Sequence, residues 1–125
     1  HFTGTLPYDQ FVPLLQLSAC HVYLTYPFVM SWSLLEAMAC GCAVVGSDTA
    51  PVREPIRHGH NGLLVDFFSP ADLAAAVAEL LQDRERAAAF GQAARRTVER
   101  TYDLDACVTR QLALMDLVAS GSIRG

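Results

Sequence analysis

The chain alternates short apolar runs with segments of helical spacing, and this alternation limits its fold more than any other feature. The apolar runs lie at residues 21–25, 43–46 and 63–65 and are rich in the side chains that favour strands. The middle run is apolar throughout, as in a strand that is covered on both faces of a parallel sheet. Strands that alternate with helices through short connections form β–α–β units. The sequence therefore predicts an α/β fold with a parallel sheet flanked by helices.

Helix signals surround these runs. Gly41 ends the helical segment after the first run, and Ser31 or Ser33 can cap its start. Ser69-Pro70 is a strong helix start, because serine caps the backbone and proline suits the first helical position. We expect one domain over residues 1–118 and a frayed tail at 119–125. The spacing predicts helices over residues 7–19, 34–40, 51–56, from 70, over 85–100 and from 103.

Charge and composition argue against several classes of partner. The formal net charge is −4 and lysine is absent. The arginines alternate with acids over residues 83–100, which is typical of a solvated helix face and not of a nucleic-acid-binding stripe. No apolar run approaches the roughly 20 residues that a membrane span needs. The pattern indicates a soluble protein that does not bind nucleic acid.

The four cysteines do not suggest a disulfide framework or a metal site. Cys40-Gly41-Cys42, with His58 and His60 downstream, resembles a zinc site only loosely, because two or more residues usually separate paired thiolates. Reduced cysteines in apolar runs behave as small buried hydrophobes. We therefore expect no metal and a reducing, cytoplasmic setting.

The connection from Tyr26 to Ser33 is the strongest candidate for a site. Ligands of an open parallel sheet bind beyond the carboxyl ends of its strands, where helices begin. Backbone N–H groups of Ser33, Leu34 and Leu35 would be unpaired there and would favour a phosphate. Glu36, about one turn into the helix, can accept two hydrogen bonds from a diol such as a ribose. It can equally complement the helix dipole, for under about 1 kcal/mol, and spacing alone does not separate these interpretations.

Three blocks of the sequence resemble a known family. They are SLLEAMACGCAVVGSD, VREPIRHGHNGLLVD and SPADLAAAVAELLQDRERAAAFGQAARRTVERTY, in this order along the chain. Over residues 2–115 the chain resembles the C-terminal domain of the group 1 (family 4) glycosyltransferases. The resemblance implies half of one Rossmann-like domain in a two-domain, B-type enzyme of carbohydrate biosynthesis. It also implies retaining transfer from a UDP-, GDP- or ADP-linked sugar to a sugar, glycan or lipid-linked acceptor, without metal or cofactor.

The family's Glu-x7-Glu motif places the functional residues. Its second glutamate, which binds the nucleotide ribose, matches Glu36, and the helix start at Ser33, Leu34 and Leu35 would meet the diphosphate. Its first glutamate, which contacts the donor sugar, falls on Phe28, and the Gly-Phe-Gly stretch after it falls on Val29-Met30-Ser31. The nucleotide end of the site matches the family, and the sugar end carries different, mostly apolar residues. The residues expected to border the donor sugar are Phe28, Met30, Ser31 and Trp32, and no catalytic residue is assigned.

Two hypotheses follow from this departure. The preferred one is a divergent, active transferase, and the alternative is a non-catalytic module that binds a nucleotide sugar or a partner. Phe2-Thr3-Gly4 reads like the end of a strand already under way, so we expect a piece of a longer protein. The acceptor domain and the family's basic Arg/Lys pair would lie outside it. Alone, the chain is expected to be inactive and to self-associate, whereas the full-length protein is expected in the cytoplasm or at the inner face of the membrane.

Other polar residues are expected to be structural. Asp48 and Glu54 are predicted to cap helices or bond to a nearby turn. Asn61-Gly62 is predicted to supply the positive φ of a turn. His58 and His60 are predicted to be solvated.

Overall fold

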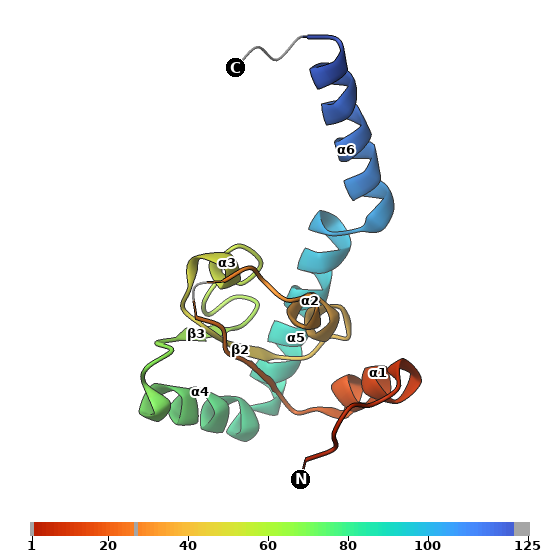
Figure 1. Ribbon diagram of the computed structural model, residues 1–125. Coiled ribbons are helices and arrows are strands. Elements are labelled where there is room, and N and C mark those ends of the chain that lie inside the picture. The colour runs from red at the N-terminus through yellow and green to blue at the C-terminus, as the bar shows by residue number, and fades with distance from the viewer. Residues whose placement is uncertain (1, 27, 122–125) are drawn as a thin grey trace.

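The computed structural model describes residues 2–26 and 28–121 (Figure 1). The described residues do not include His1, Pro27 or residues 122–125 of the expected frayed tail. The elements in chain order are α1 (Tyr8–Leu17), β1 (His21–Tyr23), α2 (Trp32–Ala39), β2 (Val44–Ser47), α3 (Ala50–Arg53), β3 (Leu63–Val65), α4 (Pro70–Gln82), α5 (Arg84–Thr101) and α6 (Leu104–Ala119).

The three strands form a parallel sheet in the order β1-β2-β3, which confirms the predicted α/β fold. Val45 pairs with Val22 on one side and with Leu63 on the other. The central strand β2 is buried at every position, as its continuous apolar run predicts. In Figure 1, α4 covers one side of the sheet, and α2 and α3 lie on the other. All three strands therefore direct their carboxyl ends to the same edge.

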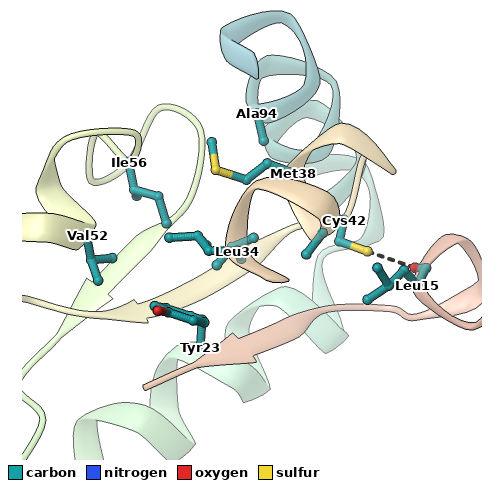
Figure 2. Close-up of a cluster of buried hydrophobic side chains, with 10 residues drawn as sticks. Leu15, Tyr23, Leu34, Met38, Cys42, Val52, Ile56 and Ala94 are labelled. Atoms are coloured by element: carbon teal, nitrogen blue, oxygen red, sulfur yellow. Dashed lines mark hydrogen bonds between the residues drawn. The ribbon is translucent and has the colours of Figure 1, made fainter. Parts of the chain in front are cut away.

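Two hydrophobic clusters hold the layers together. One lies around Val44 under α2, and the other lies around Val45 under α4, because successive side chains of a strand point to opposite faces. Figure 2 shows the first cluster, in which Leu34 and Met38 of α2 are fully buried. The Cys42 thiol in this cluster donates a hydrogen bond to the Leu15 carbonyl at 2.7 Å. Burial raises the pKa of Cys42 to about 11, so this thiol remains protonated at neutral pH.

Several boundaries differ from the sequence predictions for local reasons. α2 begins at Trp32, two residues before the expected start, because Ser31 caps it. β1 ends at Tyr23, and Thr25 beyond it bonds to the Ser47 side chain instead of continuing the ladder. Thus side-chain hydrogen bonds set both ends of the connection that carries the candidate site.

The prediction that Asn61-Gly62 supplies a positive φ is wrong. Gly59 supplies it, with φ of 73°, and Asn61 is buried. The Asn61 side chain accepts a hydrogen bond from the Arg57 N–H at 2.7 Å. Its amide group donates to the Pro55 carbonyl at 2.9 Å and to Thr97 Oγ1 at 3.1 Å. Asn61 therefore links the turn to α5, a role that requires its side chain and not a special backbone conformation.

Helix α6 extends away from the sheet and from the other helices (Figure 1). It has no buried residue, and Arg110 anchors its start by donating to the Thr101 carbonyl at 2.5 Å. No helix within the described ranges is long and apolar enough to cross a membrane. The large exposed apolar side chains of α6 are Leu104, Val108, Leu112, Leu114, Met115, Leu117 and Val118.

We expect the 125-residue chain to self-associate through α6, because burying its exposed apolar surface lowers the free energy. The double variant Leu112→Glu, Met115→Glu should shift the chain toward the monomer in light scattering coupled to gel filtration. Gln111→Glu adds a charge to the same helix and serves as the control. A wild-type chain that stays monomeric at micromolar concentration would contradict this prediction.

Candidate functional site

The start of α2 is held in place by the end of β1. Tyr23 is the last residue of β1, and its hydroxyl accepts a hydrogen bond from the Ser31 N–H at 2.9 Å. Ser31 in turn accepts from the Ser33 N–H through Oγ at 3.3 Å and from the Leu34 N–H through its carbonyl at 3.2 Å. The prediction that the Ser33 and Leu34 N–H groups are unpaired is therefore wrong. The Ser33 bond lies just beyond the usual range of about 2.7–3.2 Å and the Leu34 bond lies at its upper end, so the bond to the capping hydroxyl is the longer of the two.

Glu36 lies half-buried on the next turn of α2. Its carboxylate has no hydrogen-bond or ion-pair partner within the described ranges, where the salt bridges join Asp48 to Arg53, Glu79 to Arg86 and Glu99 to Arg95. Burial, followed by the negative charge of Glu36, raises the pKa of the Cys40 thiol one turn further along. Glu36 is thus a charged acceptor without a protein donor.

The observed start of α2 weakens the alternative interpretation of Glu36. Glu36 is the fifth residue of this helix, and the first turn carries no acidic residue. The attraction between a carboxylate and the helix dipole falls off within the first turn. Attraction to the dipole of α2 therefore explains little of why Glu36 stands at this position.

Most of the residues expected on the donor-sugar side are exposed. Phe28 and Trp32 are 75% and 82% exposed, Met30 is half-buried, and Ser31 is the exposed cap. The Leu34 side chain, in contrast, belongs to the core. A cavity of about 450 Å³, within the size range of ligand sites, brings together some of the predicted residues with others from the α5–α6 junction. Its lining residues are Met30, Trp32, Leu35, Tyr102, Leu104 and Cys107.

Polar contacts tie the β1 and β2 loops together at the carboxyl edge of the sheet. The Thr25 N–H donates to Ser47 Oγ at 3.0 Å, and the same hydroxyl donates to the Thr25 carbonyl at 2.7 Å. Arg53 donates to both carboxylate oxygens of Asp48, at 2.5 and 2.8 Å. Asp48 thus forms an ion pair and is not the helix cap, since Thr49 precedes α3 without a capping side-chain bond. Glu54 accepts from the Tyr102 hydroxyl at 3.3 Å.

The Asp48–Arg53 pair should make stability depend on pH. The hydrogen bond from Arg53 holds the pKa of the Asp48 carboxyl below its ordinary value, so the pair stabilises the fold above that value. This stabilisation is lost as the pH falls through the lowered folded-state pKa. Solvent screens the contribution, because the two side chains are 39% and 61% exposed.

We expect the free energy of unfolding to fall less between about pH 5 and pH 2 in Asp48→Asn than in the wild type, as measured in urea at each pH. Asp105→Asn removes an exposed carboxylate that no salt bridge of the described residues involves, and it should follow the wild type. If the free energy of unfolding depends on pH equally in the wild type and in Asp48→Asn, the ion pair does not contribute to stability.

An aromatic cluster that was not predicted from the sequence lies at this edge. Tyr26 follows β1, and Phe67 and Phe68 follow β3. The Tyr26 ring centroid lies 5.4 Å from that of Phe67 and 5.0 Å from that of Phe68, and the two phenylalanine rings are 5.1 Å apart. The signal was present in the sequence, because each aromatic residue follows a predicted strand and the carboxyl ends of parallel strands meet at one edge.

His58 and His60 do not belong to a metal site among the described residues. His58 Nδ1 accepts a hydrogen bond from the Leu64 N–H at 3.0 Å, so it supports the turn before β3. His60 is exposed. Within residues 2–26 and 28–121, no three His, Cys, Asp or Glu side chains are placed to hold a metal ion. That the protein works without a metal stays a prediction.

Comparison with known proteins gives consistent results. The family model described as "Glycosyl transferases group 1" matches residues 1–97. D-inositol 3-phosphate glycosyltransferase of Geodermatophilus obscurus is 38% identical over 92 residues, which cover 72% of this chain and 20% of that protein. The sucrose-phosphate synthase of Thermosynechococcus elongatus shares the fold, with a TM-score of 0.84 at 22% identity over 97% of this chain and 30% of that one. Anabaena HepE in complex with UDP-glucose has a TM-score of 0.70 at 24% identity, over 87% of this chain and 30% of that one.

Proposed function

The chain belongs to the group 1 glycosyltransferases, and on this basis we propose that it supplies the donor-binding part of an enzyme that transfers a sugar with retention of configuration. The chain spans 20% of the Geodermatophilus relative and 30% of each of the two solved structures, so the activity proposed is that of a longer protein. The donor is a UDP-, GDP- or ADP-linked sugar, and the acceptor is a sugar, a glycan or a lipid-linked sugar. We place this protein in the cytoplasm or at the inner face of the membrane.

The observation that carries the proposal is the unpaired carboxylate of Glu36 beside the start of α2. The Glu36 carboxylate has no protein donor among the described residues, so it is free to accept hydrogen bonds from a ligand, and two vicinal hydroxyls of a ribose can supply them. The Ser33 N–H bonds only to the capping hydroxyl of Ser31, at 3.3 Å, so an anion that displaces this side chain can accept from it, whereas the Leu34 N–H stays with the Ser31 carbonyl. A diphosphate next to the ribose would occupy this position.

The names of related proteins support a nucleotide-sugar donor. HepE of Anabaena was solved with UDP-glucose, and a Mycobacterium tuberculosis relative is described as a GDP-mannose-dependent mannosyltransferase. These names differ in nucleotide base and in sugar, so they leave both open for this chain. The proposal accordingly names a class of donors and not one compound.

A non-catalytic module that binds a nucleotide sugar or a partner is the second candidate. The observation that favours it is Phe28, which stands where the resemblance places a sugar-contacting glutamate and is 75% exposed. A phenyl ring cannot accept hydrogen bonds from sugar hydroxyls as a carboxylate does. The donor sugar would then need other polar contacts for transfer.

Donor hydrolysis by the full-length protein tests the proposal without a known acceptor. UDP-glucose, GDP-mannose and ADP-glucose are incubated separately with the protein, and proton NMR follows the anomeric signal of the released sugar before it equilibrates. In hydrolysis, the bond from the sugar C1 to the diphosphate oxygen breaks and a water oxygen bonds to C1. An α-linked donor that yields the α sugar first supports retention, and the β sugar refutes it. Binding in calorimetry without any turnover would favour the non-catalytic module. No binding of any of the three donors would refute the donor role and leave only a module that binds a partner.

A further inference from the structure

Tyr26, Phe67 and Phe68 together form a surface that we call the aromatic platform. Tyr26 lies in the loop after β1 and the two phenylalanines lie in the loop after β3, so the platform bridges the carboxyl end of the central strand β2. The Tyr26–Phe68 and Phe67–Phe68 pairs are edge-to-face, and the Tyr26–Phe67 pair is tilted by 48°. These geometries are favourable for aromatic pairs. The rings therefore support one another.

Hydrogen bonds hold both loops that carry the platform. Thr25, next to Tyr26, exchanges two bonds with Ser47 at the end of β2. The Phe68 N–H donates to Asp66 Oδ1 at 2.9 Å, and the Ser69 N–H donates to the Asp66 carbonyl at 3.1 Å. The platform is thus ordered before any ligand arrives, which lowers the entropic cost of binding.

Within the 125-residue chain the platform is open to solvent. Tyr26 is 57% exposed and Phe68 is 68% exposed. Ordered aromatic rings that stay exposed forgo the free energy of burial, and clustered exposed apolar groups usually mark a binding site. The ligand expected here has an apolar face that can lie on a ring.

The Asp48–Arg53 ion pair lies at the same edge of the sheet as the loops that carry the platform. The Asp48 N–H donates to the carbonyl of Val65, the residue before Asp66, at 2.7 Å, and Ser47, before Asp48, bonds to Thr25. Asp48 therefore lies between the two aromatic loops. Each carboxylate oxygen still has a free lone pair and the guanidinium still has free N–H groups, so the pair can both accept from and donate to hydroxyl groups.

We propose that the aromatic platform stacks against a pyranose ring whose hydroxyl groups bond to the Asp48–Arg53 pair. One face of a pyranose carries C–H groups with partial positive charge, which suits the negative face of an aromatic ring. Its edge carries hydroxyls, which suit a pair that both donates and accepts. A nucleobase is a poorer match, because the proposed ribose position at Glu36 ties the base to α2. This inference rests on the proposed function, which brings sugars to this edge.

The sugar ring can belong to the donor or to the acceptor, and saturation-transfer NMR on the full-length protein distinguishes them. The probes are the methyl α-glycosides of glucose, mannose and N-acetylglucosamine, first alone and then with saturating UDP-glucose or GDP-mannose. We expect at least one glycoside to bind, with about tenfold weaker binding in Tyr26→Ala and Phe68→Ala. Phe68→Trp should keep the binding. If the nucleotide sugar displaces the glycoside, the platform holds the donor sugar, and if both bind together, it holds the acceptor.

Tyr8→Ala is the matched control, because Tyr8 is an exposed aromatic residue of α1 that packs on Phe11 and not on the platform. Thermal unfolding midpoints should fall only slightly in Tyr26→Ala and Phe68→Ala, because each loses two ring contacts but is more than half exposed. Glycoside binding that survives in Tyr26→Ala and Phe68→Ala, or saturation that reaches only nucleobase protons, would overturn the proposal. Glycoside binding without any nucleotide binding would refute the proposed donor role and would still support a sugar site at the platform.

Discussion

Gly91→Ala should destabilise the fold by about 3 kcal/mol, at the upper end of the cost of overpacking. Gly91 lies in the middle of α5, where it packs against the turn that ends α2. An added Cβ would lie 2.0 Å from the Gly41 carbonyl oxygen and 2.9 Å from its carbonyl carbon. Both are backbone atoms, so neither can rotate away. α5 would have to separate from the turn, and the core contact between Met38 and Ala94 would loosen with it.

The expected loss of stability in Gly91→Ala is opposite in sign to the effect of the same change in an isolated helix. In a helix without tertiary contacts, replacing glycine by alanine stabilises by up to about 1 kcal/mol. Urea unfolding of the full-length protein or of the 125-residue chain measures the outcome. Gln92→Ala changes the exposed neighbour on the same helix and should have little effect. A Gly91→Ala variant as stable as the wild type would mean that α5 does not approach Gly41 this closely in solution.

The sequence predicts the strands better than it predicts these contacts. The apolar runs give Leu63–Val65 in full and the other two strands within two residues at each end, since burial on both faces leaves few alternatives. The helix ends depend on capping, and here Ser31 proved to be the cap of α2. Gly91 gives no local signal, because its role depends on Gly41, which is 50 positions away in the chain.

The candidate site divides in the same way. Helix periodicity and the resemblance placed Glu36 near the start of α2, and the structure adds that its carboxylate lacks a partner. Whether the Ser33 N–H is paired could not be read from the sequence, because the Ser31 side chain can either cap it or turn outward. The aromatic platform joins residues about 40 positions apart through the strand order, which only the fold establishes.

Glu36→Ala should weaken nucleotide binding by the full-length protein by about 5- to 150-fold, which corresponds to the 1–3 kcal/mol of charge-assisted hydrogen bonds. The ligand in the calorimetric titration is the nucleoside diphosphate that the wild type binds best. A purely electrostatic role gives the opposite sign, because removing a negative charge beside a diphosphate strengthens binding. Glu54→Gln, which alters an exposed carboxylate bonded to Tyr102, is the control and should bind like the wild type.

A deoxynucleotide identifies the group that Glu36 contacts. If the carboxylate accepts from the ribose hydroxyls, the 2′-deoxy and 3′-deoxy diphosphates should bind more weakly than the ribonucleotide to the wild type. In Glu36→Ala this difference should disappear, because the effects of two changes at one contact are not additive. A difference that persists in Glu36→Ala would assign the ribose to another residue. Glu36 would then be a half-buried carboxylate whose role lies outside donor binding. Saturation-transfer NMR on the same protein would still test whether the aromatic platform binds a sugar.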